Sequence, residues 1–231
     1  MKIYIDRQKV NSRAALANAA SVGGLLILLL SVVAPLFWQS LAAFALVLLL
    51  LGGVTAMVGI YLANRWVRRP RPEESLDKAL KAFDDNYRLY HYPALPSDHV
   101  LLTPSGVVAL EVVNLPGSFT YRDGRWKEAM TIGRALRYVV EPRVGDPVAV
   151  SQGLSEGLQR WFKDHLDSSA EVPVRALTVF THPAVELEIA DASVPAYKVA
   201  KLRKHAVPAG GKLAPRLYDE LAARLEKATI S

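Results

Sequence analysis

No charged residue occurs between Arg13 and Arg65, and this uncharged stretch constrains the fold more than any other feature of the sequence. It contains two apolar blocks, roughly residues 16–38 and 41–64, separated only by a short polar turn. Each block has about 20 residues, enough for an α-helix to cross a hydrocarbon core of about 30 Å. Residues 14–64 are therefore predicted to form a two-span transmembrane hairpin.

The residues beside this hairpin predict its orientation. Basic side chains flank both blocks, whereas the turn between the blocks carries no charge. The positive-inside rule places both flanks in the cytoplasm, and anionic lipid headgroups account for the cations without nucleic acid. A cleaved signal peptide is the alternative, but the first block is longer than a signal h-region and a second block follows at once. We expect a multi-pass protein of the inner (cell) membrane with both termini and its soluble domain in the cytoplasm. The basic residues are Lys2, Arg7, Lys9 and Arg13 before the hairpin and Arg65, Arg68, Arg69 and Arg71 after it.

The remaining chain is long enough for one independent domain. An Arg/Pro-rich linker follows the hairpin, and the domain after it has about 160 residues, enough to bury its own core. The absence of cysteine excludes disulfides and thiolate metal sites. The predicted organisation is a basic N-terminus over residues 1–13, the hairpin over 14–64, the linker over 65–72 and the domain over 73–231.

Hydrophobic periodicity and turn signals predict an α/β domain. Apolar residues at helical spacing predict helices, and short β-branched runs between Gly, Pro and Asp predict strands. This order of elements favours a central mixed sheet flanked by helices. The predicted helices cover residues 73–83, 147–166, 198–205 and 213–229. The predicted strands cover 87–92, 100–102, 107–113, 118–121, 125–127, 172–181 and 194–199, with a strand or turn over 185–189 and a short strand near 136–140.

Two of these strands form a β-hairpin that contains two carboxylates. The turn Thr-Pro-Ser-Gly separates the apolar runs 100–102 and 107–113. Asp98 precedes the first strand, and Glu111 lies late in the second. A carboxylate within an apolar strand is costly unless it is paired, hydrogen-bonded or bound to a metal. Asp98 and Glu111 are therefore the first candidates for a functional site.

The motifs around this hairpin resemble those of a known family, the NERD (nuclease-related) domain. That family has an Asp before a strand, a Pro-x-Gly turn, a strand ending in Glu-x-Lys-Asn, a Gly-x-Trp turn and an Asn-Pro helix start with a nearby Gln. The resemblance covers roughly residues 73–205 and implies a fold like the restriction-endonuclease-like PD-(D/E)XK nucleases. The matching residues are Asp98, Pro104 to Gly106, Glu111 to Asn114, Gly124 to Trp126, Asp146-Pro147 and Gln152.

The resemblance implies a metal site. In the superfamily an Asp and a Glu hold a divalent cation, usually Mg²⁺, and a Lys assists the attacking water. Hard carboxylate oxygens suit Mg²⁺, which stabilises charge at a phosphate and lowers the pKa of its bound water. By resemblance Asp98 and Glu111 are the metal ligands, with Glu74 as an assisting carboxylate from the first helix. Val113 occupies the position of the family's Lys, so Lys127 of the next hairpin is the candidate for a relocated lysine.

Three hypotheses for function follow. The first is a degenerate nuclease fold that binds DNA, RNA or a protein partner at the cytoplasmic face of the lipid bilayer. The second is an active Mg²⁺-dependent nuclease that uses Asp98, Glu111 and Lys127, and the third is a structural membrane scaffold. Val113 favours the first and third, and whether the protein is an enzyme stays open. The histidines show no metal-ligand spacing, and His99 is predicted to be an ordinary residue of a strand face.

Overall fold

The computed structural model describes residues 1–38, 40, 42–130, 144–166, 171–191 and 193–230. Two compact units divide the chain. One, which we call the sheet unit, contains residues 1–6 and the chain from Pro72 onward, apart from residues 130–143. The other contains residues 7–71, and we call it the hairpin unit. The predicted strand near residues 136–140 lies outside the described residues.

The hairpin unit consists of two long apolar helices, α1 (Arg7–Phe37) and α2 (Ala42–Trp66). Both are long and apolar enough to cross a membrane. Their large apolar side chains are mostly exposed, including Leu25, Leu36 and Phe44. An apolar surface of this extent is typical of a helix pair that contacts lipid or another protein. The two apolar helices predicted from the sequence are therefore confirmed.

Small residues bring α1 and α2 into close contact. The buried positions of α1 include Val10, Ala17, Gly24 and Ser31, which are seven residues apart, as in a coiled-coil seam. A Cβ atom on Gly24 would overlap the backbone of Ala56, so only glycine fits there. Gly23, the neighbour of Gly24, has nothing within 4 Å of its Cβ position and does not contribute to the packing.

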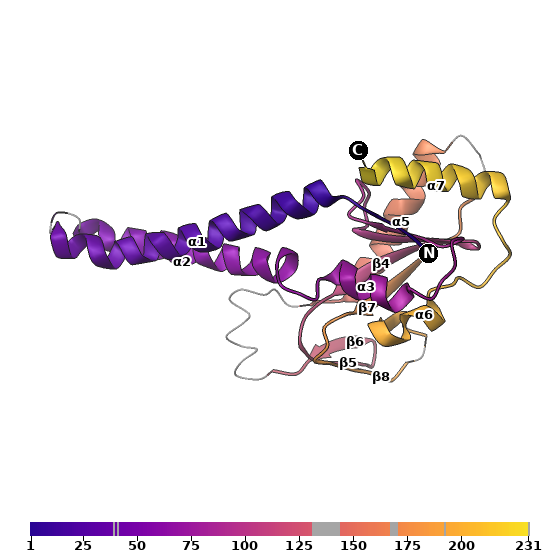
Figure 1. Cartoon of the computed structure of the whole chain (residues 1–231). Coiled ribbons are helices and arrows are strands. Elements are labelled where there is room, and N and C mark those ends of the chain that lie inside the picture. The colour runs from indigo at the N-terminus through magenta and orange to yellow at the C-terminus, as the bar shows by residue number, and fades with distance from the viewer. Residues whose placement is uncertain (39, 41, 131–143, 167–170, 192, 231) are drawn as a thin grey trace. The chain divides into compact units, whose positions relative to one another are not determined.

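A six-stranded mixed sheet forms the centre of the sheet unit, in the order β1-β2-β3-β4-β7-β9 (Figure 1). Strands β2, β3 and β4 are antiparallel neighbours, whereas β1 pairs in parallel with β2, and β7 in parallel with β4 and β9. The bounds are β1 Lys2–Ile5, β2 Arg88–His91, β3 His99–Thr103, β4 Gly106–Val113, β7 Val174–Phe180 and β9 Ala196–Lys198. This sheet, with the flanking helices described below, confirms the predicted α/β class.

The edge strand β1 was not predicted from the sequence. Residues 1–13 were expected to be only a basic flank, but Lys2 to Ile5 pair with Arg88 to His91. Helix α1 then begins at Arg7, well before the apolar block. The first residues therefore complete a sheet whose other strands all follow the hairpin unit.

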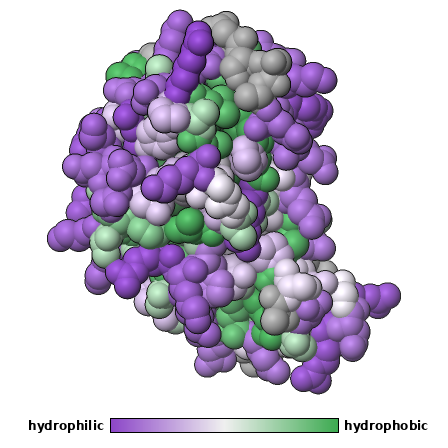
Figure 2. Space-filling view, turned by 90° about the vertical axis from the view of Figure 1, so that its right-hand side faces the viewer, coloured by the Kyte–Doolittle hydropathy of each residue, from purple (hydrophilic) through white to green (hydrophobic). Residues whose placement is uncertain are grey.

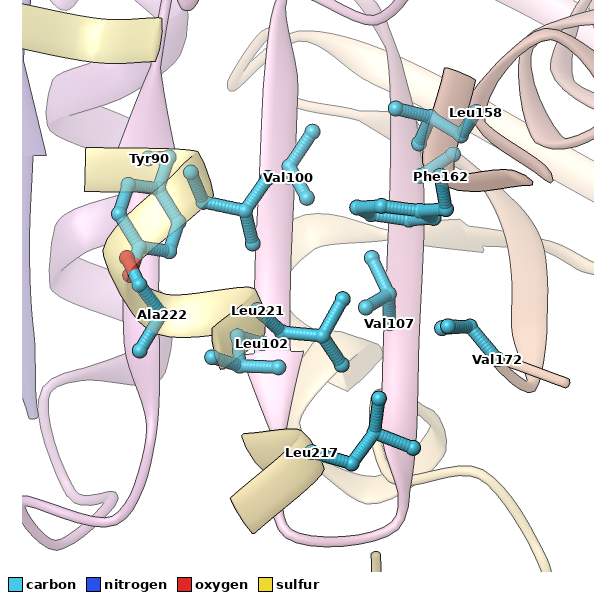
Figure 3. Packing of buried hydrophobic residues seen from close by; sticks show 12 residues of the cluster. Tyr90, Val100, Leu102, Val107, Leu158, Phe162, Val172, Leu217, Leu221 and Ala222 are labelled. Atoms are coloured by element: carbon cyan, nitrogen blue, oxygen red, sulfur yellow. The ribbon is translucent and has the colours of Figure 1, made fainter. Parts of the chain in front are cut away.

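Helices cover both faces of the sheet. Helices α5 (Pro147–His165) and α7 (Pro215–Ile230) lie on one face (Figure 1). Helix α3 (Pro72–Leu80) and the short α6 (Leu202–His205) lie on the other face. A single 3₁₀ turn (Val199–Lys201) precedes α6. On the first face, Val100 and Val107 pack against Phe162 of α5 and Leu221 of α7 (Figure 3). Burial raises the pKa of Tyr90 in this cluster, so its hydroxyl stays protonated and donates to the Ala222 carbonyl at 3.3 Å.

A second, three-stranded sheet extends the unit, in the order β6-β5-β8. Its strands are β5 (Gly117–Arg122), β6 (Arg125–Glu128) and β8 (Val185–Ile189). Phe119 of β5 packs against Phe180 of β7 with ring centroids 5.2 Å apart, which joins the small sheet to the large one. The face of the sheet unit seen in Figure 2 is largely hydrophilic, with apolar residues only in scattered patches.

Candidate functional site

Asp98 and Glu111 lie at the same end of the neighbouring strands β3 and β4. Val100 with Ala109 is the last pair of this antiparallel ladder, and continuing the same register by two residues would bring Asp98 opposite Glu111. Asp98 lies one residue before β3, and its carbonyl accepts a hydrogen bond from the Tyr92 amide of the β2 end at 2.6 Å. Because side chains alternate along a strand, Glu111 projects on the face that holds Val100 and Ala109, and an extended continuation of β3 would place Asp98 on the same face.

This pair lies at the carboxyl end of the parallel strands β4 and β7, beside the start of α5. Glu111 pairs with Thr178 of β7, and the Thr178 hydroxyl donates to the carbonyl of Pro147, the first residue of α5, at 3.0 Å. The carboxyl ends of parallel strands are where open α/β sheets bind ligands. Asp98 and Glu111 are both partly exposed, so a ligand can reach them.

Helix α5 begins as its sequence predicts. Asp146 is its N-cap and accepts hydrogen bonds from the amides of Val148 and Ala149, each at 3.0 Å, with Pro147 at the first helical position. Two of the free amides at this helix end are thus satisfied by the chain itself. Gln152, one turn further on, is exposed.

The structure also shows what surrounds the position of the missing lysine. Val113 lies two residues after Glu111, so the two side chains share one face of β4. Val113 is only 7 % exposed and packs in a cluster with Phe119 and Phe180. A lysine here would project beside Glu111, whereas the valine forms part of the contact between the two sheets.

Lys127 lies on the small sheet, away from this cluster. It pairs with Thr120, whereas the neighbouring pair Tyr121 and Trp126 packs toward Phe180. Because neighbours in a strand point to opposite faces, Lys127 projects from the outer face of β6, where it is exposed. The structure therefore does not bring Lys127 to the side of the sheet where its neighbours meet Val113.

The first helix supplies a buried carboxylate, but it is Glu73 rather than the predicted Glu74. Glu73 is 2 % exposed and accepts a hydrogen bond from the Tyr92 hydroxyl at 2.7 Å. Glu74 is partly exposed. Helix α3 packs on the face opposite to Val100 and Ala109. Glu73 therefore reaches the end of β2 from the side of the sheet that Asp98 and Glu111 do not occupy.

Two buried histidines form a polar cluster that the sequence reasoning missed. His91 of β2 pairs with His99 of β3, and their Nδ1 atoms are 2.8 Å apart. The His91 Nε2 lies 2.9 Å from the Asp77 carboxylate of α3. When Asp77 is ionised, His91 donates from Nε2, and one Nδ1 atom donates to the other. The sequence could have indicated this pair, because an antiparallel pairing of the predicted strand 87–92 with the strand after it brings His91 opposite His99.

The carboxylate pair matches Mg²⁺ in the way proteins usually hold this ion. Mg²⁺ is commonly bound by one or two carboxylates, with waters and substrate phosphates completing its coordination. Glu111 of β4 and Asp98, the residue before β3, are two hard oxygen donors at the same end of neighbouring strands. Across the described part of the chain, no group of three or more His, Asp or Glu side chains is placed to hold a metal by itself. Any cation at this pair would therefore need further ligands from water or phosphate.

Comparison with known proteins identifies the region that holds this pair. A family model described as nuclease-related domain (NERD) matches residues 71–181. The chain carries a NERD domain. No curated protein and no solved structure matches the chain. The matched residues begin just before α3 and end just after β7, so the NERD domain includes Asp98, Glu111 and Val113. The resemblance inferred from the hairpin motifs is confirmed.

Proposed function

We propose that this protein is a membrane-anchored NERD-domain protein that binds nucleic acid at the cytoplasmic face of the membrane and has lost efficient cleavage. The observation that carries this proposal is the combination of a cross-strand carboxylate pair with a buried valine at the lysine position. Asp98 and Glu111 are the residues that would hold Mg²⁺, and the ion would supply positive charge to stabilise a phosphate. Val113 cannot supply a cation beside Glu111.

The anchor is supported by α1 and α2 and by the pairing of β1. Residues on both sides of the hairpin unit, Lys2 to Ile5 and Arg88 to His91, pair in one sheet. The chain must therefore leave and return on the same side of a membrane, as a two-span hairpin does. The basic flanks favour the cytoplasmic side. The net charge of +6 also favours an anionic partner. We propose nucleic acid, in addition to lipid headgroups, as that partner because of the two carboxylates.

The test uses the full chain in lipid nanodiscs and labelled single- and double-stranded DNA and RNA. We expect salt-sensitive binding that requires Mg²⁺, is abolished by a chelator, and leaves the nucleic acid intact. Asp98→Asn and Glu111→Gln should each remove the Mg²⁺ dependence. Glu186→Gln is the matched control, because Glu186 is an exposed carboxylate of the small sheet.

The alternatives have distinct outcomes in the same assay. Cleavage that Glu111→Gln abolishes would show an active Mg²⁺-dependent nuclease, and its further loss in Lys127→Ala would assign the relocated lysine. Absence of binding to every nucleic acid would favour a structural scaffold or a protein partner. Binding that is insensitive to Mg²⁺ and to both site variants would place the interface elsewhere on the domain.

A further inference from the structure

Strand β1 is an open edge of the six-stranded sheet. It pairs with β2 on one side, and within the described residues no strand pairs with it on the other. The amides of Lys2 and Asp6 donate to carbonyls of the β2 segment at 3.0 Å and 3.2 Å, so the even-numbered residues bond to β2. Because successive peptide groups of a strand point to opposite sides, the N–H and C=O groups of Ile3 and Ile5 point away from β2.

The two residues with outward backbone groups also carry apolar side chains that the core does not use. Ile3 is 45 % exposed and Ile5 is partly exposed. Neither belongs to a hydrophobic cluster of the described residues, whereas Tyr4 between them packs against the core and stacks on Tyr90 with centroids 5.0 Å apart. An uncovered edge with β-branched apolar side chains is a template for another strand.

The sequence of this edge is complementary to itself in one antiparallel register. A pairing centred on Tyr4 brings Ile3 opposite Ile5, and Lys2 opposite Asp6, of a second copy. The two isoleucines are then hydrogen-bonded pairs that exchange both N–H···O bonds, which satisfies every outward group of both strands. Lys2 and Asp6 take the positions where cross-strand side chains come closest, and their charges are opposite. A lysine on an edge strand usually opposes pairing, but here the second copy places a carboxylate opposite it.

The limits of β1 exclude the neighbouring registers. A pairing centred on Ile3 would need the backbone of Met1, whose amino group bonds instead to the chain that follows α3. A pairing centred on Ile5 would bring Ile3 opposite Arg7, the first residue of α1, where the backbone is helical. The register centred on Tyr4 is therefore the one that uses the whole strand.

We infer that β1 is a dimerisation strand, on which a second copy of this chain adds its own β1 in antiparallel to join two sheet units through one continuous sheet. The inference uses only residues of the sheet unit and does not depend on the proposed function. Two short strands bury little surface, so we expect a weak pair that is best detected by covalent trapping.

Disulfide trapping reports the register directly, because the chain has no cysteine. Lys2→Cys and Asp6→Cys are made in separate full-length chains that carry different affinity tags. In the inferred register the Cα atoms of positions 2 and 6 of opposite copies are about 4.5 Å apart, within the range of a disulfide. Two copies of the same variant hold their cysteines about 14 Å apart, four residues along the strand and beyond the reach of a disulfide.

The two chains are mixed in detergent and mildly oxidised. We expect the mixed pair to be the main covalent product and each variant alone to remain largely monomeric. Equal cross-linking of like and unlike pairs would show random collision or pairing elsewhere in the chain, and would overturn the inference. Absence of any covalent dimer at high protein concentration would overturn it as well.

Ile3→Pro in both cysteine chains is the second test. Proline has no N–H, and the amide of Ile3 points away from β2, so the substitution blocks the second copy and keeps the bonds between β1 and β2. We expect the mixed cross-link to be lost while amide hydrogen exchange in β2 and β3 stays as slow as before. Ile3→Val is the matched control, because it keeps the amide and a β-branched side chain and should retain the cross-link. Cross-linking that persists in the proline chains would overturn the pairing through this edge.

Discussion

Removing one buried hydroxyl tests how α3 is held on the sheet. Tyr92 is 2 % exposed, and its hydroxyl donates to Glu73, also 2 % exposed, at 2.7 Å. Tyr92→Phe removes this donor and keeps the ring, which contacts His99 with centroids 5.0 Å apart. The backbone of Tyr92, with a φ of 59°, is equally unfavourable for both residues. The substitution therefore isolates the hydrogen bond to the carboxylate.

The expected loss follows from the charge and burial of the acceptor. A hydrogen bond to a charged group contributes about 1.5–3 kcal/mol to stability, and loss of the donor leaves a buried carboxylate with less compensation. The matched control is Tyr218→Phe, whose hydroxyl donates at 2.8 Å to the neutral carbonyl of Asn86 at an exposed position. There we expect about 0.5 kcal/mol, because water replaces the lost donor.

Urea unfolding of the full chain in detergent micelles measures both variants. Trp126 and Trp161 lie in the sheet unit and Trp38 and Trp66 in the hairpin unit, so both variants are made in a chain with Trp38 and Trp66 replaced by Phe, where intrinsic fluorescence follows the sheet unit. Tyr92→Phe should lower the unfolding midpoint more than Tyr218→Phe at an unchanged slope against urea concentration. If the two variants lose the same free energy, the Tyr92–Glu73 bond does not hold α3. Its docking would then depend on the apolar contacts of Leu76 and Leu80.

Two further predictions concern the hairpin unit and α5. Gly24→Ala should destabilise the α1–α2 pair by about 1–3 kcal/mol because its Cβ overlaps the Ala56 backbone, whereas Gly23→Ala should be neutral or slightly stabilising. Denaturant unfolding followed by helical circular dichroism compares the pair, and equal losses would contradict the packing. Asp146→Ala should lower the urea stability of the sheet unit by about 1 kcal/mol, and Asp146→Asn should retain most of it. An unaffected Asp146→Ala variant would show that the cap is dispensable.

The pairing of β3 with β4 was predictable from the sequence because a short turn fixes its register. Thr103 pairs with Gly106 across the Pro-Ser turn, and each step outward along both strands adds one pair. The ladder continues to Val100 and Ala109, and two more steps in the same register would bring Asp98 opposite Glu111. Local spacing thus contains enough information to place both side chains on one face. The same local logic predicted the start of α5 at Asp146-Pro147, where the cap and the proline act within one turn.

Features that depend on distant pairing were not predictable in this way. Lys2 pairs with Arg88 across the whole hairpin unit, and four residues of alternating character give no sign of that partner. The choice between Glu73 and Glu74 depends on the rotation of α3 over the sheet. One residue corresponds to about 100° around a helix, so a carboxylate pair at a helix start does not reveal which member is buried.

The absence of the lysine is coupled to the packing of the two sheets. Strand alternation places residues 111 and 113 on one face, which is the geometry that a Glu-x-Lys pair requires. Here that face continues from the carboxylate into the apolar cluster of Val113, Phe119 and Phe180. An ammonium group at position 113 would lose hydration among these rings and would separate the two sheets that they join. A single Val113→Lys substitution is therefore not a simple restoration of a nuclease, because the cluster would have to be redesigned with it.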